Sequence, residues 1–546
     1  MAGMAYADIW EEIAGAVPGR PALLQGERLI TWGQMDRRAN ALARHMLDAG
    51  LTHQSKVCAY LYNGPEYLEA YFAAFKAGLV PVNTNYRYGA QELTYLFDNA
   101  DAEAVVFHAS FADLVDKIRG DLPKVKTWLA VAQPGHPVPA WAADYEAIAA
   151  AGADRTIAPW GRSPDDLIFM YTGGTTGMPK GVMWRQEDLF TVLGAGANLL
   201  EALPAYEGLA DVRARALAKE SGELAPPARM LAAAPLMHAT AQFTAFAILT
   251  GGGAVVTLPS QRFSAVELWS EVERLQVSSL SIVGMAFAQP MLEALDANPG
   301  RWDLSGLKRI GSSGTVWNFE NKQGLLRHLP DCTLFDSLGS SEAVGIGGST
   351  STAGAASQTA AFMVGINAAV FDEAGQRIAP GSGERGLVAT AGNIPVGYYK
   401  DPEKSAKTFR TFEGRRWAVP GDFATVDADG TMRLLGRGSQ VINTGGEKVF
   451  PEEVEEALKR HGSVRDAVVV GVPDPRFGER ICAVVDVDPA VQAPTLAELA
   501  GHVRSQLADY KAPRELVLAP VVRAPNGKVD YKAARALALQ ALNISA

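Results

Sequence analysis

The sequence has few cysteines and no leader-like start. Its 546 residues include three cysteines, Cys58, Cys332 and Cys482, which are widely spaced and form no CxxC pair. This excludes a disulfide-stapled small fold and a cysteine-based metal site, and it suits a reducing compartment. Residues 1–10 (MAGMAYADIW) show no basic segment before an apolar run, which argues against a secretory signal. We therefore expect a cytoplasmic protein.

Long hydrophobic runs are missing as well. The best candidate for a membrane span is residues 239–261, which carry no charge. Three glycines at 251–253 divide it, and each half is too short to cross a bilayer as a helix. A buried helix, a turn and a buried strand fit the segment better, so we expect no integral membrane segment.

The chain also lacks an excess of basic charge. Lys+Arg 50 against Asp+Glu 60 gives a net charge of −10, so no global field attracts nucleic acid or anionic lipid. A polyanionic ligand would have to be held by a local site. Hydrophobic residues make up 48% and charged residues 20%, as in ordinary globular chains with more than one domain. Glycine is the abundant residue, at 54 of 546, against a usual share of about 7%.

Short β-branched runs alternate with helical patterns through most of the chain. We expect strands near residues 56–62, 104–108, 167–171 and 254–258, and a helix over 66–76. This alternation predicts an α/β sheet architecture. The charged, proline-containing stretch 201–230 is interpreted as an inserted surface excursion.

The pattern changes in the last third of the chain. From about Phe362, short strands broken by turns predict a small β-rich subdomain. After a glycine-rich point near Arg437, a compact α+β segment follows. It is expected to contain helices at 451–460 and 496–507 and strands at 466–472 and 481–487. We therefore expect a large N-terminal domain over 1–436 and a small C-terminal domain over 437–546.

The strongest local signal is residues 171–181, YTGGTTGMPKG, directly after an expected strand. Glycines let backbone N–H groups converge on an anion, the threonine hydroxyls donate further hydrogen bonds, and Lys180 adds a positive charge. These are the groups that bind a triphosphate. The spacing is not a Walker A loop, because no glycine precedes the lysine and no Ser or Thr follows it. A P-loop kinase or GTPase is therefore disfavoured.

Two other enzyme signatures are not supported by the sequence. Residues 381–386 (GSGERG) formally match GxGxxG, but they precede a strand pattern instead of opening a helix, so we interpret them as a turn. No GxSxG elbow is present, which argues against a serine hydrolase.

The phosphate loop is one of six motifs that occur in order. The others are residues 234–238 (APLMH), 336–342 (DSLGSSE), 420–422 (PGD), 435–437 (LGR) and 525–528 (PNGK). This ordered set resembles the adenylate-forming superfamily of acyl-CoA synthetases, adenylation domains and luciferases, over essentially the whole chain. Within it, residues 181–185, 392–400 and 445–453 look most like the actinobacterial fatty-acid and steroid side-chain CoA ligases.

The resemblance implies two half-reactions. A carboxylic acid first reacts with Mg²⁺-bound ATP to give an acyl-adenylate and pyrophosphate, and the C-terminal domain is then expected to rotate so that CoA displaces AMP. The resemblance implies ATP and Mg²⁺ as cofactors and CoA as a co-substrate. The implied partners are a small carboxylic acid, ATP and CoA, and no nucleic acid is expected. The resemblance leaves open whether the protein forms a homodimer.

The resemblance also assigns site residues. It implies catalytic roles for Lys528, His238, Glu342 and Lys180, with Glu342 as the metal ligand. The implied ATP and AMP contacts are Thr172, Gly173, Gly174, Thr175, Thr176, Gly177, Lys180, Ser313, Gly314, Asp336, Ser337, Leu338, Gly339, Ser341, Asp422, Arg437 and Lys528. Leu338 departs from the tyrosine of many relatives, which would remove aromatic stacking on adenine.

For the second half-reaction, the resemblance implies a hinge at Ser439 and a CoA tunnel along Gly445, Gly446 and Lys448. The implied acyl pocket contains His238, Phe243, Met285, Phe287 and Gly311. That mixture suits an extended apolar acid, such as a long-chain fatty acid or a steroid side-chain acid. Four alternatives are open. The substrate could be an aryl or cycloalkyl acid, the acceptor could be a carrier protein, or the protein could be a luciferase-like oxygenase or a catalytically inactive binding protein.

Overall fold

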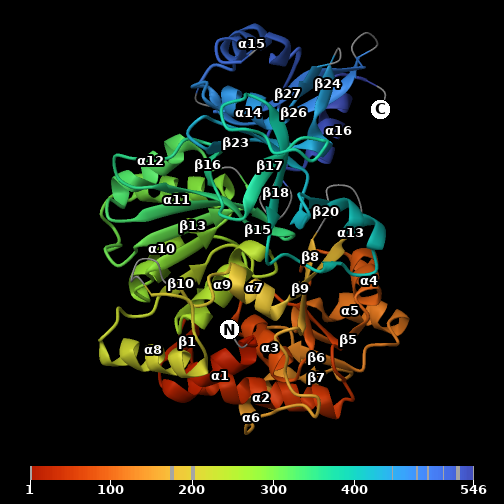
Figure 1. The fold of residues 1–546 in the computed structure, drawn as a ribbon, viewed down its shortest axis with the longest axis vertical. Helices are drawn as coiled ribbons and strands as arrows, with labels where there is room; N and C mark the ends of the chain where they lie inside the picture. Colours follow the sequence, from red (N-terminus) through yellow and green to blue (C-terminus); the bar gives the residue numbers. More distant parts are fainter. Residues whose placement is uncertain are drawn as a thin grey trace. The chain divides into compact units, whose positions relative to one another are not determined.

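The computed structural model describes residues 3–172, 178–197, 203–315, 317–444, 447–474, 478–488, 491–507, 509–523 and 529–544. Within these ranges, the side chains of Arg437, Ser439, Asn443, Glu447, Lys448 and Gly478 are not described. The chain divides into two compact units (Figure 1). Unit 1 comprises residues 1–358, 391–411 and 416–418, and unit 2 comprises 359–390, 412–415 and 419–546.

Unit 1 contains two large sheets. In the first, the order is β2-β1-β11-β10-β12-β13-β14-β15. Strands β1, β11, β10, β12, β13 and β14 run parallel, and β2 and β15 are antiparallel to their neighbours. The bounds are β1 (Pro21–Gln25), β2 (Arg28–Thr31), β10 (Arg229–Ala232), β11 (Ala254–Thr257), β12 (Ser279–Ile282), β13 (Arg309–Ser313), β14 (Thr333–Ser340) and β15 (Ala343–Ser351).

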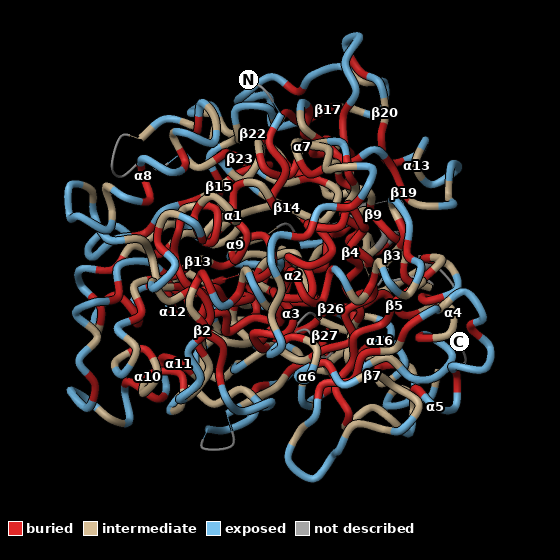
Figure 2. The backbone as a smooth tube through the Cα atoms, turned by 90° about the horizontal axis from the view of Figure 1, so that it is seen from below, coloured by how far each residue is buried: buried red, intermediate tan, exposed pale blue. Residues whose placement is uncertain are grey.

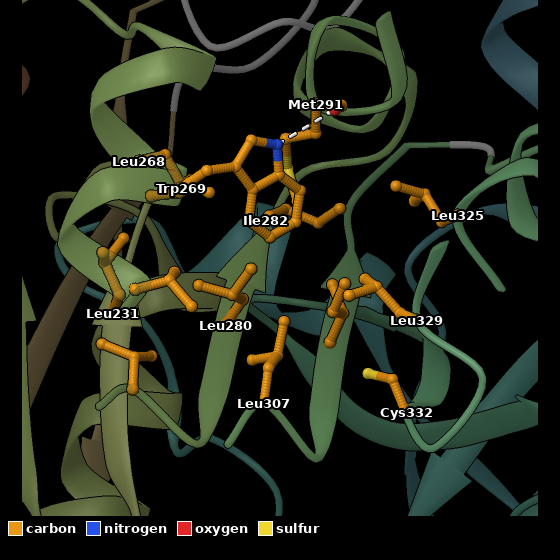
Figure 3. Packing of buried hydrophobic residues seen from close by; sticks show 14 of the residues in the cluster. Leu231, Leu268, Trp269, Leu280, Ile282, Met291, Leu307, Leu325, Leu329 and Cys332 are labelled. Atoms are coloured by element: carbon orange, nitrogen blue, oxygen red, sulfur yellow. Dashed lines mark hydrogen bonds between the residues drawn. The ribbon is translucent and has the colours of Figure 1, made fainter. Parts of the chain in front are cut away.

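Three helices pack on this sheet through one hydrophobic core: α10 (Ala265–Arg274), α11 (Met285–Ala297) and α12 (Phe319–His328). A fourth helix, α9 (Ala239–Thr250), contacts β10, β11 and β12 outside that core. Figure 3 shows Trp269 of α10 between Leu268 and Met291, above Leu280 of β12. The Trp269 indole N–H donates to the Met291 carbonyl at 3.0 Å, so the buried ring keeps its polar atom bonded.

The second sheet has the order β19-β9-β8-β4-β3-β5-β6-β7. Its strands are β3 (Lys56–Tyr60), β4 (Val80–Asn83), β5 (Ala102–His108), β6 (Thr127–Val131), β7 (Ala143–Asp144), β8 (Leu167–Thr172), β9 (Lys180–Arg185) and β19 (Gly397–Tyr398). Buried residues, red in Figure 2, run along β3, β4 and β5. Such continuous apolar runs are typical of parallel strands covered on both faces, which explains why the sequence signalled β3 and β5.

The remaining helices of unit 1 are α1 (Tyr6–Ala16), α2 (Trp32–Asp48), α3 (Pro65–Lys76), α4 (Ala90–Asn99), α5 (Ala112–Ile118), α6 (Tyr145–Ala151), α7 (Gln186–Val192), α8 (Leu209–Ser221) and α13 (Pro402–Thr408). A buried ion cluster joins four segments, namely α1, α2, α3 and the loop before β8. The Lys76 ammonium, with no exposed surface, lies 2.7 Å from an Asp36 carboxylate oxygen and also bonds Glu11. Arg162 donates to both oxygens of Glu11, at 2.6 and 2.8 Å.

The stretch interpreted as a surface excursion contains a helix, α8. Val212, Arg215 and Ala216 are its buried face, and Arg213 bonds Glu12 of α1 at 3.0 Å. Other charged residues of the helix also contact the rest of unit 1, since Lys219 donates to the Gly251 carbonyl and Glu220 pairs with Arg20. The number of charged residues in the stretch concealed the helical period. By contrast, residues 239–261 form a helix, a turn and a strand (α9, β11), as expected. No helix among the described residues is long and apolar enough to cross a bilayer.

Unit 2 contains the expected β-rich region and the α+β segment. The first has the antiparallel order β16-β23-β22-β18-β17, formed by β16 (Ala361–Val364), β17 (Ala368–Phe371), β18 (Arg385–Ala391), β22 (Asp422–Val426) and β23 (Thr431–Arg437). Strands β20 (Phe409–Phe412) and β21 (Arg415–Ala418) lie between β18 and β22 in sequence. Residues 381 and 382 form a turn and a bend, and Arg385 and Gly386 already belong to β18, so the segment leads into a strand and does not open a helix, as interpreted.

The α+β segment is a sheet with a core on each face. Its elements are β24 (Ile442–Thr444), β25 (Glu447–Val449), α14 (Pro451–Lys459), β26 (Val464–Asp474), β27 (Gly478–Val487), α15 (Leu496–Arg504), β28 (Glu515–Leu518) and α16 (Tyr531–Ala541). Along β26, Val469 joins the core that includes residues of α14 and α15, whereas Val468 and Val470 join the core that includes residues of α16. Alternation along the strand therefore places one helix layer on each face. The predicted mixed α/β class with a β-rich region and a smaller α+β segment is confirmed; the functional boundary at Arg437 stays a prediction.

Candidate active site

The phosphate-loop residues connect β8 and β9, which form an antiparallel hairpin with Thr172 paired to Lys180. Gly173, Gly174, Thr175, Thr176 and Gly177 lie outside the described residues. The Lys180 ammonium forms an ion pair with the Asp401 carboxylate, which also caps α13 by accepting from the Lys404 N–H at 2.9 Å. The hydrogen bond from Lys180 lowers the pKa of Asp401. The loop lysine is thus held at the root of the hairpin.

Several predicted residues lie at the ends of adjacent parallel strands. His238 follows β10 and is the residue directly before α9, and Met285 begins α11 after β12. Ser313 ends β13, and Gly314 follows it. Residues 336–339 occupy the end of β14. Because β10, β12, β13 and β14 are parallel neighbours, these ends meet at one edge of the sheet, where open α/β sheets bind ligands.

Hydrogen bonds connect these ends. The Thr240 hydroxyl of α9 donates to the Ser313 carbonyl at 3.5 Å, and Ser281 of β12 donates to the Thr240 carbonyl at 3.5 Å. Gly314 has φ +92°, in the left-handed region that glycine adopts without strain. The start of α9, with His238, therefore lies against the ends of β12 and β13.

Asp336 occupies a buried position on β14 opposite Ser312 of β13, while Ser337 pairs with Ser313. Its carboxylate lies 3.1 Å from the Lys322 ammonium of α12, and both side chains are at most 5% exposed. Burial raises the pKa of Asp336, and the Lys322 charge opposes that rise. Leu338 and Gly339 follow on the same strand.

Two side chains donate hydrogen bonds to Ser341 and Glu342. The Tyr398 hydroxyl donates to Glu342 Oε1 at 2.7 Å, and the buried Trp184 indole donates to the Ser341 carbonyl at 2.9 Å. No group in the described part of the chain donates to Glu342 Oε2. One carboxylate with an available oxygen fits Mg²⁺, which is bound through one or two carboxylates plus substrate phosphates. The described residues contain no cluster of three or more His, Cys, Asp or Glu side chains that could hold a metal alone.

The predicted acyl-pocket residues lie on elements around the same sheet. Phe243 of α9 is buried and meets the Trp184 ring edge-on at 6.3 Å. Phe287 of α11 packs edge-on against Phe263, with 4.9 Å between the ring centroids. Gly311 lies in β13 opposite Phe335 of β14. A cavity of about 280 Å³ lies elsewhere, in unit 2, lined by residues that include Phe423, Phe450 and Arg385.

Within unit 2, the structure pairs two residues that the resemblance paired functionally. Asp422 and Arg437 are direct cross-strand partners of β22 and β23. Ser439 lies in the 3₁₀ turn Gly438–Gln440, and Lys448 lies in β25 opposite Asn443. Gly445, Gly446 and Lys528 lie outside the described residues.

Sequence reasoning missed two asparagines. The Asn83 carboxamide accepts from the Tyr171 N–H at 2.6 Å and donates to the carbonyls of Tyr171 and Met237 at 2.9 and 2.7 Å. It joins the strand before the phosphate loop to the residue before His238. The Asn63 carboxamide accepts from the Leu236 N–H and donates to the Ala232 and Ala234 carbonyls. The available signal was a polar residue directly after, or near the end of, a buried strand.

Known proteins are similar to this chain over almost its whole length. Residues 10–399 match the family described as AMP-binding enzyme, and residues 453–528 match the AMP-binding enzyme C-terminal domain. The chain is 42% identical over 539 residues to a medium/long-chain-fatty-acid–CoA/3-oxocholest-4-en-26-oate–CoA ligase of Mycobacterium marinum, covering 97% of this chain and 96% of that one. It is also 42% identical to a 3-oxocholest-4-en-26-oate–CoA ligase of Rhodococcus rhodochrous, covering 97% and 95%.

The solved structures agree on the fold. An anthranilate CoA ligase, AuaEII, in complex with anthranoyl-AMP superposes with a TM-score of 0.82 at 21% identity, covering 100% of this chain and 99% of that one. The family matches and the fold define an AMP-binding α/β enzyme. The chain belongs to the AMP-binding enzyme family. The resemblance to adenylate-forming acyl-CoA synthetases, and within them to fatty-acid and steroid side-chain CoA ligases, is confirmed.

Proposed function

We propose that the chain is an ATP-dependent carboxylic acid–CoA ligase for a long-chain fatty acid or a steroid side-chain acid. The acid's carboxylate attacks the α-phosphorus of ATP and pyrophosphate leaves, giving an acyl-adenylate. The CoA thiol then attacks the acyl carbon, AMP leaves, and the thiol proton goes to solvent. The observation that carries the proposal is the convergence of residues from separate motifs at one edge of the parallel sheet β10-β12-β13-β14.

The phosphate end would be bound by the β8–β9 hairpin. Thr172 and Lys180 stand opposite each other at its root, so the loop between them is presented from fixed ends. The ammonium of Lys180 supplies positive charge to the β- and γ-phosphates. Glu342 would hold Mg²⁺, which neutralises charge on the triphosphate when bound. Charge that builds on the leaving pyrophosphate is thus met by groups already in place.

The nucleoside and the acid would lie along the sheet edge. Asp336 and the ends of β13 and β14 are proposed to receive the adenine, and Asp422 with Arg437 the ribose and phosphate. The His238 imidazole, held at the start of α9, would orient the substrate carboxylate. Phe243, Met285, Phe287 and Gly311 would line the acyl chain.

The C-terminal segment is proposed to alternate between two tasks. Lys528 would bridge the substrate carboxylate and the α-phosphate during adenylation. Rotation about Ser439 would then bring Gly445, Gly446 and Lys448 to the CoA side, and Gly438 beside the hinge supplies backbone freedom.

The decisive experiment separates the half-reactions. Lys528→Ala should lower pyrophosphate exchange by about 10²–10³-fold, the scale for loss of one preorganised charge-stabilising group. It should leave thioester formation from supplied acyl-AMP largely intact. Replacing Gly446 with Trp should do the reverse. Equal loss of both half-reactions in Lys528→Ala would contradict the division of labour, and unimpaired CoA transfer in Gly446→Trp would contradict the tunnel.

The acid class rests on the two relatives named above and needs its own assay. Pyrophosphate release should be measured over aliphatic, steroid and aromatic acids, with CoA or a carrier protein as acceptor. We expect long-chain or steroid acids with CoA to give the highest kcat/KM. A preference for aryl acids, or for the carrier protein, would replace this assignment.

We also place the reaction in the cytoplasm, where ATP and CoA are available. In support, Cys58, Cys332 and Cys482 are all free and buried. Cell fractionation that recovers the ligase outside the cytoplasmic fraction would refute this location.

A further inference from the structure

Residues 392–400 (GNIPVGYYK) are one of the segments on which the resemblance was based, yet the reaction described above gives them no task. The structure shows where this segment lies. Gly397 and Tyr398 form β19, which pairs antiparallel with β9, the strand that leaves the phosphate loop. Tyr398 stands opposite Val182, and the Tyr399 N–H donates to the Gly181 carbonyl at 2.8 Å.

The pairing decides which side chains share a face. Residues opposite each other in an antiparallel pair point to the same face, as do residues two apart on one strand. Tyr398, Val182 and Trp184 therefore share a face. From this face two donors reach the candidate metal segment, the Tyr398 hydroxyl to Glu342 Oε1 and the Trp184 indole to the Ser341 carbonyl.

Tyr399 points to the opposite face. Its ring packs against Phe169, which is paired with Met183, and its hydroxyl donates to an Asp101 carboxylate oxygen at 2.7 Å. Two adjacent tyrosines thus make bonds of equal length to carboxylates, but only one reaches the candidate site.

We propose that Tyr398 is a positioning residue that holds Glu342 for the metal, with Trp184 fixing the backbone beside it. This inference rests on the proposed function, because that function makes Glu342 the metal carboxylate. Tyr398 is only 6% exposed, so its packed side chain has little freedom to move the hydroxyl away from the carboxylate. With Oε1 occupied by this donor, the Glu342 carboxylate cannot rotate freely, and Oε2 is left for the ion. Groups that hydrogen-bond a metal ligand in this way contribute to affinity without touching the metal.

The test compares Tyr398→Phe with Tyr399→Phe, a matched control that loses the same atom and a bond of the same length. Mn²⁺ is titrated into each full-length protein saturated with α,β-methylene ATP, and binding is followed by electron paramagnetic resonance. Tyr398→Phe should weaken Mn²⁺ binding about tenfold, the low end for loss of a ligand's hydrogen-bond partner. Tyr399→Phe should stay within about twofold of wild type, and Tyr398→Phe should still convert supplied acyl-AMP to the thioester.

Unchanged Mn²⁺ affinity in Tyr398→Phe, or equal losses in the two variants, would overturn the proposal. Trp184→Phe provides a second variant on the same face, and it should weaken the ion severalfold if the Ser341–Glu342 segment is positioned as argued. A wild-type protein that binds Mn²⁺ with the analogue but forms no acyl-adenylate would overturn the proposed function instead. The comparison of the two tyrosines would still decide the role of Tyr398.

Discussion

Replacing Asn83 with alanine tests how the site is held together. The carboxamide is 3% exposed and makes three hydrogen bonds, two to Tyr171 and one to Met237. At about 1 kcal/mol net for each bond, Asn83→Ala should cost about 3 kcal/mol of unfolding free energy. The variant also leaves the buried Tyr171 N–H without an acceptor, which costs additional free energy. The loss of unfolding free energy should therefore be at least about 3 kcal/mol.

Asn63→Ala provides the matched comparison. Asn63 also makes three bonds, all to the chain between Ala232 and Leu236, but its side chain is half-buried and water can replace it. We expect a smaller loss, about 1–2 kcal/mol. Only Asn83 reaches β8, so Asn83→Ala should raise the KM for ATP severalfold, whereas Asn63→Ala should chiefly change the KM for the acid.

The assays are urea unfolding, with the slope checked for two-state behaviour, and steady-state pyrophosphate release. A loss below about 0.5 kcal/mol in Asn83→Ala would show that the three bonds carry no net stability. Equal effects of the two variants on the KM for ATP would show that Asn83 does not act through the phosphate hairpin.

Three further outcomes are expected. Burial raises the pKa of Glu11, but the positive charges of Arg162 and Lys76 together outweigh burial, and the pKa falls to about 2. The stabilisation from the ionised Glu11 is therefore fully present above pH 4.5 and is lost as the pH falls toward 2. Glu11→Gln should cost about 3 kcal/mol at pH 7 in urea unfolding and only about 1 kcal/mol at pH 3; a pH-independent difference would contradict this. Lys322→Met, which leaves the Asp336 carboxylate buried alone, should cost about 3–5 kcal/mol and weaken ATP binding, and adding Asp336→Asn should recover part of the stability; additive losses would argue against the pair. Leu338→Tyr should tighten ATP binding by calorimetry about two- to tenfold through stacking on adenine, and no change would place adenine elsewhere.

Much of the fold was predictable because its strands are continuous apolar runs. The helix of 239–250 and the strand of 254–257 follow from composition and three glycines. Helix α8 was missed because only a narrow face of it is buried. In such a helix few apolar residues repeat at helical spacing, so the pattern is hard to recognise among the charged residues.

The site was predictable where a motif is local and not where a contact is distant. Asp422 and Arg437 were paired by resemblance and are cross-strand partners in the structure. The contacts of Asn83 to Met237 and of Tyr398 to Glu342 join residues 154 and 56 positions apart. A single asparagine or tyrosine carries no sign of its partner, because the sheet topology brings the two together only after folding.

The β8–β9 hairpin has a consequence for protein engineering. Since Thr172 and Lys180 are directly paired, residues 173–179 form an insert whose two ends are anchored in one sheet. A segment of equal length taken from another family member can be grafted there without shifting the register of either strand. Binding of the triphosphate should therefore be adjustable by exchanging this segment alone, while the residues proposed to bind the adenine and the acid stay unchanged.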